Sequence, residues 1–137
     1  MSVEENKAAV RSLSEVITKR NFSKFSELFT PNYVFHSAPD VKGPEGVTQT
    51  FTTLTAAFPD YQEKIERMVA EGDLVAVFYT MSGTFKNTFG GVAPTGKKFS
   101  IPSAVLSRFE NGKQVEAWPY YDNSEWARQL GVPVSAE

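Results

Sequence analysis

The first part of the chain carries apolar residues at helical spacing. Across residues 3–20 they recur three or four positions apart, with charged residues between them, which predicts an amphipathic helix. A second short helix is expected over residues 22–29, and Pro31 ends it. Pro44 suits the first turn of a third helix over residues 44–58.

The pattern then changes to the period of two that is typical of strands. Residues 74–80 are almost wholly apolar, which indicates a strand in the middle of a sheet, covered on both faces. The other strands are expected at residues 33–36, 61–70, 99–109 and 113–122. Helices followed by a run of antiparallel strands predict the α+β class. By length, residues 1–137 are expected to form one domain.

A hairpin is the strongest local signal near the C-terminus. Asn111 and Gly112 tolerate the positive φ angles that a type I′ turn needs, so the strands should meet with Glu110 opposite Lys113. Without a bulge, this pairing places Asp122 opposite Ile101.

One face of the last strand combines acids and large rings, namely Glu116, Trp118, Tyr120 and Asp122. Two adjacent rings on a fully solvated face would be unusual, so this face is predicted to line a pocket. A carboxylate beside aromatic surface loses hydration, which raises its pKa and makes Asp122 a candidate proton carrier. The alternative interpretation of Asp122 is a helix cap or an ion-pair partner.

The same pairing predicts which residues share the pocket. Glu116 would be a hydrogen-bonding group on the pocket face, whereas Arg108 would point away and form an ion pair on the surface or at a dimer face. The predicted pocket walls are Trp118, Tyr120, Ile101, Ser103, Val105 and Phe58.

Composition excludes several classes of function. A net charge of −2, without a basic block, gives no reason to expect nucleic acid or a membrane surface as a partner. The chain has no cysteine and one histidine, so neither thiolate chemistry nor a transition-metal site is expected. No long apolar run or apolar signal core is present, and a cytoplasmic protein is the expectation.

Several short motifs carry a family resemblance when taken in order over residues 5–131. They include Gly43-Pro44-Glu45-Gly46, then Asn111-Gly112-Lys113, Val115-Glu116-x-Trp118, and Arg128-Gln129-Leu130-Gly131 after Asp122. This arrangement resembles the SnoaL-like polyketide cyclases of the nuclear-transport-factor-2-like superfamily.

The resemblance implies a fold and an activity. The fold would be a cone-shaped α+β barrel of the cystatin-like type, in which a strongly curved, mixed or antiparallel sheet wraps around the N-terminal helices. Family members commonly form homodimers through the outer face of the sheet. The implied activity is cofactor-free and metal-free acid/base catalysis on a small hydrophobic carbonyl compound, by intramolecular aldol closure or a related isomerisation. Asp122 matches the family's acid/base residue, and His36 would donate a hydrogen bond to the oxyanion or be structural.

Two other functions stay open at this point. One is a non-catalytic carrier of an apolar ligand, in which Asp122 would bind a ligand hydroxyl or cap a helix. The other resembles the limonene epoxide hydrolases, which need an arginine and a second acid beside the aspartate. The strand pairing finds no such arginine near Asp122, so this function ranks below the cyclase.

Overall fold

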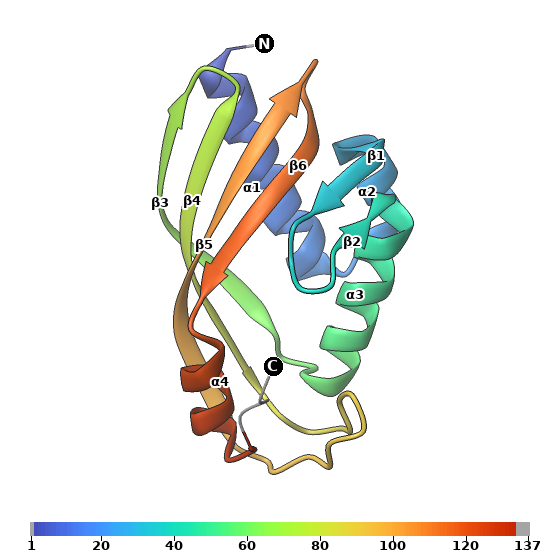
Figure 1. Cartoon of the computed structure of the whole chain (residues 1–137), viewed down its shortest axis with the longest axis vertical. Helices are drawn as coiled ribbons and strands as arrows, with labels where there is room; N and C mark the ends of the chain where they lie inside the picture. The colour runs from blue at the N-terminus through green and yellow to red at the C-terminus, as the bar shows by residue number, and fades with distance from the viewer. Residues whose placement is uncertain (1, 134–137) are drawn as a thin grey trace.

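The computed structural model describes residues 2–133. Its elements are α1 (Val3–Lys19), η1 (Phe22–Lys24), α2 (Phe25–Leu28), β1 (Phe29–Phe35), β2 (Val41–Lys42), α3 (Gly43–Ala57), β3 (Gln62–Glu71), β4 (Leu74–Thr84), β5 (Lys98–Glu110), β6 (Lys113–Tyr121) and α4 (Asn123–Leu130). The strands form one curved sheet in the order β2-β1-β6-β5-β4-β3 (Figure 1). The predicted α+β fold, with a curved mixed sheet and N-terminal helices, is confirmed.

The helices start and end where local chemistry allows. Ser2 and Glu5 form a reciprocal capping box at the start of α1, with two hydrogen bonds of 3.1 Å. Arg20 ends the helix in the left-handed conformation and donates to the carbonyl of Ile17 at 2.8 Å. The buried face of α1 then packs against β3 and β4, while α3 packs against β1.

Two features of the sheet were not predicted. β1 begins at Phe29, inside the segment expected to be helical, because α2 ends after a single turn at Leu28. The pair of strands that makes the sheet mixed is β1 and β6, which lie parallel with Phe35 opposite Ala117. This pairing joins segments that are distant in sequence, which local patterns cannot reveal.

A β-bulge in β6 decides which of its side chains point inward. The hairpin turn forms as expected, with positive φ at Asn111 and Gly112, and Glu110 pairs with Lys113. Gln114 then pairs with Phe109, whereas Glu116 pairs with Arg108, so Val115 between them has no partner on β5. This extra residue shifts the register by one. A shift of one residue moves every following side chain to the other face of the sheet.

Beyond the bulge, Tyr121 pairs with Ser103, so the expected pairing of Asp122 with Ile101 is wrong. Ala117 is fully buried and Tyr121 lines a cavity, whereas Tyr120 is 61% exposed. The prediction that Glu116, Trp118 and Tyr120 form the inner face is therefore wrong, although they do share one face.

An aromatic cluster closes the sheet end next to α4. Phe58, fully buried, stacks on Phe85 and meets Phe99 edge-on, both at 5.3 Å between ring centroids. Gly83 leaves room for this contact, since a Cβ there would lie 3.2 Å from Phe58. The cluster anchors the end of α3 to β4 and β5.

The variant Phe58→Ala is expected to lower the free energy of unfolding by about 3–5 kcal/mol, because it removes a buried ring and leaves a void. Urea denaturation followed by circular dichroism measures this loss. Val69→Ala is the control, since Val69 is 61% exposed and its loss should change stability little. Equal effects of the two changes would contradict the packing described for this cluster.

Candidate functional site

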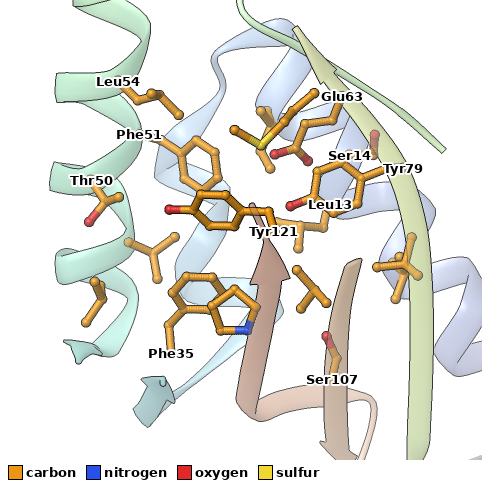
Figure 2. A pocket seen from close by; sticks show the side chains of 18 of the residues that line it. Leu13, Ser14, Phe35, Thr50, Phe51, Leu54, Glu63, Tyr79, Ser107 and Tyr121 are labelled. Carbon is orange, nitrogen blue, oxygen red and sulfur yellow. The ribbon is translucent and has the colours of Figure 1, made fainter. Parts of the chain in front are cut away.

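A cavity of about 280 Å³ lies between α1, α3 and the inner face of the sheet (Figure 2). Most of its surface is apolar, which suits a hydrophobic small molecule. The lining residues from the helices are Val10, Leu13, Ser14, Ile17, Val47, Thr50, Phe51, Leu54 and Trp126. Those from the strands and connections include Phe35, Val41, Tyr61, Glu63, Ile65, Val77, Tyr79, Met81, Phe89, Val105, Ser107, Gln114, Pro119 and Tyr121.

Glu63 is the acidic group of this cavity. It lies on β3, and its carboxyl oxygen accepts a hydrogen bond of 2.5 Å from the Tyr61 hydroxyl. The residue keeps some surface because it faces the cavity, while protein atoms surround its carboxyl group. Burial raises the pKa of Glu63, and the Tyr61 hydrogen bond opposes that rise in part. The carboxyl group is thereby suited to exchange a proton nearer neutral pH.

Phenol groups surround this carboxyl group. Figure 2 shows Tyr79 beside Glu63, and Tyr121 reaching from the end of β6 toward α3. Burial raises the pKa of Tyr79 and Tyr121, and burial together with the charge of Glu63 raises that of Tyr61. All three phenols therefore stay protonated at neutral pH and can donate hydrogen bonds.

The cavity opens beside Tyr121. This residue lines the cavity and yet is 45% exposed, so it lies at the boundary with solvent. Thr50, across from it on α3, is also exposed. These two residues therefore place the boundary between the cavity and solvent near α3 and the end of β6.

The predicted pocket walls divide into three groups. Val105 lines the cavity. Ile101, Ser103 and Phe58 are buried but belong to the packed core rather than to the cavity lining. Trp118 and Tyr120 lie on the outer face because of the bulge.

The residues predicted to be catalytic lie outside the cavity lining. Asp122 is exposed and caps α4, where its carboxylate accepts the backbone N–H of Glu125 at 3.0 Å. His36 stacks on Trp118, with 5.1 Å between ring centroids, and its Nε2 lies 2.8 Å from a carboxylate oxygen of Glu116. These positions give no support to the acid/base role expected of Asp122 or the oxyanion role expected of His36.

The outer face holds a charged network around Glu116. Arg108 donates to Glu116 at 2.8 Å and to Glu110 at 2.6 Å, in agreement with the ion pair predicted for Arg108. Hydrogen bonds from His36 and Arg108 lower the pKa of Glu116. Glu116 was expected on the pocket face, and this expectation is wrong for the same reason as for Trp118.

Sequence reasoning missed Glu63, although a signal was present. Glu63 lies midway between Tyr61 and Ile65 on the same face of the strand, so an acid interrupts an otherwise apolar row. The alternation that predicts Trp118 and Tyr120 on the pocket face predicts Tyr121 on the opposite face, and Tyr61 lies at the start of the strand expected at residues 61–70. Glu63, Tyr61 and Tyr121 all line the cavity.

Other kinds of site find no support within residues 2–133. No group of three or more His, Cys, Asp or Glu side chains in this range is placed to hold a metal ion. In the same range, no helix has the length and apolar character needed to span a membrane.

Comparison with known proteins identifies the family. Residues 7–130 match the SnoaL-like polyketide cyclases. The chain belongs to this family. No curated protein sequence matches the chain.

Solved structures of similar proteins have the same fold. IdmH of Streptomyces antibioticus, for which polyketide cyclase activity is proposed, is 31% identical, with a TM-score of 0.78 over 93% of this chain and 99% of that one. AclR of Streptomyces galilaeus, for which hydroxylase activity is proposed, is 28% identical, with a TM-score of 0.84 over 96% of this chain and 100% of that one. Similar folds thus carry different proposed activities, so the function has to be argued from the residues of the site.

The variant Asp122→Ala tests the role of this residue as a cap. Loss of an N-cap carboxylate is expected to lower the free energy of unfolding by about 1 kcal/mol, because the backbone N–H of Glu125 loses its partner. Urea denaturation measures the change. Asn123→Ala is the matched control at the next position and should cost less. A larger loss in the control would show that Asp122 does not cap the helix.

Proposed function

We propose that the protein catalyses cofactor-free acid/base chemistry on a small hydrophobic carbonyl compound, by intramolecular aldol closure, with Glu63 as the acid/base group. The observation that carries this proposal is a single carboxyl group, buried and hydrogen-bonded to a phenol, among the described residues of an apolar cavity. Membership of the polyketide cyclase family supports the reaction class.

The reaction would proceed in three balanced steps. The Glu63 carboxylate removes a proton from the carbon next to a substrate carbonyl, which gives an enolate and a carboxylic acid. The enolate carbon then attacks a second carbonyl of the same molecule, so a carbon–carbon bond forms and the second oxygen becomes an alkoxide. The Glu63 carboxylic acid returns its proton to this alkoxide. No electrons are gained or lost overall.

The tyrosine hydroxyls would supply the remaining chemistry. Tyr61 donates to Glu63 and fixes the orientation of its carboxyl group. Tyr79 and Tyr121 also carry phenol donors, and we assign them to the oxygen on which negative charge develops. Asp122 receives a positioning role, because capping α4 fixes the chain directly after Tyr121.

Turnover of a panel of hydrophobic diketones tests the assignment of Glu63. Glu63→Gln is expected to lower kcat at least about 100-fold, since general acid/base groups contribute on this scale. The wild-type rate should rise as the pH rises through the elevated pKa of Glu63, because the first step needs the carboxylate.

Glu66→Gln is the matched control, because Glu66 is an exposed glutamate on the same strand. It should keep wild-type turnover. Full activity of Glu63→Gln would refute the assignment. Loss of activity in Asp122→Asn would also refute it, because asparagine can still cap α4 and keep the position of Tyr121. Tight binding of the panel without any product would favour the alternative function of a carrier.

We also propose that the protein is a homodimer formed through the outer face of the sheet. Two rows of apolar residues cross this face, with Phe78, Ala104 and Tyr120 in register in one and Ala76, Leu106 and Trp118 in the other. Phe78 and Tyr120 are 41% and 61% exposed. A continuous apolar surface of this kind typically marks an association site.

Sedimentation velocity tests this association. Phe78→Lys is expected to convert a wild-type dimer into a monomer, because it places a charge in the apolar row. Val92→Lys is the control, since Val92 is 40% exposed and lies outside the sheet. A monomeric wild-type protein, or a variant Phe78→Lys that stays dimeric, would overturn the proposal.

A further inference from the structure

The charge balance of the cavity is one-sided. Its described lining residues include Glu63 but no lysine, arginine or histidine. The hydrogen bond found for the Glu63 carboxyl group comes from a neutral phenol, Tyr61. A buried carboxylate without a positive partner is unfavourable, and the described lining supplies no such partner.

Aromatic rings surround the same carboxyl group. The ring of Phe51, on α3, lies 6.4 Å from the ring of Tyr61 between centroids. Tyr61 is the hydrogen-bond partner of Glu63, so α3 contributes a ring close to the carboxyl group. Tyr79 and Tyr121 lie close enough to Tyr61 to raise its pKa. Glu63 in turn lies close enough to Tyr79 to raise the pKa of that phenol. The faces of such rings attract cations, most strongly where water is excluded.

We propose that this cavity binds hydrophobic amines in their positively charged form, with the ammonium group beside Glu63 and the apolar body in the rest of the cavity. The inference uses the cavity and the carboxyl group of the proposed function but requires no reaction. An amine bound in this way would compete with a carbonyl substrate, because both need Glu63.

The cation would supply what the cavity lacks. It forms an ion pair with Glu63 in a place of low dielectric constant, where such attraction is strong. It is also attracted to the faces of the aromatic rings, whereas a neutral molecule of the same shape gains no such electrostatic attraction. An anionic ligand would meet the opposite situation, since Glu63 repels it and no described lining side chain carries a positive charge.

Two probes of nearly identical shape test the inference. Benzyltrimethylammonium carries a permanent positive charge, and neopentylbenzene is its uncharged carbon analogue. Ligand-observed NMR titrations measure the affinity of each for the full chain. Wild-type protein is expected to bind the cation at least about tenfold more tightly, which corresponds to about 1.4 kcal/mol. Glu63→Gln should abolish this preference, whereas the control Glu66→Gln should retain it.

A pH series on wild-type protein supplies a second readout if Glu63→Gln does not fold. The probe keeps its charge at every pH, and the facing groups Tyr61, Tyr79 and Tyr121 have raised pKa values. Affinity for the cation should therefore fall as the pH is lowered and Glu63 takes up a proton.

Three outcomes would overturn the inference: equal affinity for the two probes, a preference for the cation that survives in Glu63→Gln, or an affinity independent of pH. Because these titrations involve no turnover, they are independent of the diketone assay. Lack of activity with cation binding intact would refute only the proposed reaction.

Discussion

The desolvation of one carboxyl group is the constraint on which the account depends. Glu63 lies in a cavity bounded by apolar side chains and phenols, and its hydrogen bond from Tyr61 offsets the cost of burial in part. In water the same group would be an ordinary weak acid, ionised and unreactive near neutral pH. The fold raises its pKa by removing water, and no described residue of the cavity lining supplies a positive counter-charge.

The curved sheet and the helices create this environment together. Tyr61 directly precedes β3, which carries Glu63. β4 contributes Tyr79, and Tyr121 lies at the end of β6 (Figure 2). These strands come together only in the folded sheet, where β6 lies between β1 and β5. The outer face carries the two apolar rows, and at one side of them Arg108 and His36 surround the Glu116 carboxylate. The sheet thus separates the cavity that holds Glu63 from the apolar rows of the outer face.

The sequence predicted most of the fold but little of the site. The helical periods of α1 and α3 and the Asn111-Gly112 turn are local signals, and each is confirmed. The face of β6 is not a local signal, because the single unpaired residue Val115 reverses it. Trp118 and Tyr120 consequently lie on the outer surface and not in the predicted pocket. Val105 lines the cavity as predicted, because β5 has no bulge at this position.

Asp122 shows why a motif does not by itself assign a role. A carboxylate at the start of a helix accepts a hydrogen bond from a backbone N–H whether or not it also contacts a substrate. In this structure Asp122 accepts such a bond from Glu125. Glu63, by contrast, belongs to no short motif. Only the three-dimensional enclosure of its side chain distinguishes it from the exposed glutamates of the same strand.

The pKa of Glu63 tests this account most directly. A carbon-detected NMR titration of the side-chain carboxyl group, in protein labelled at glutamate, follows its protonation without any substrate. We expect a midpoint clearly above the value of about 4.3 that is usual for glutamate. In Tyr61→Phe the midpoint should rise further, because that variant loses the hydrogen bond that favours the carboxylate. A midpoint at or below the usual value would contradict this account.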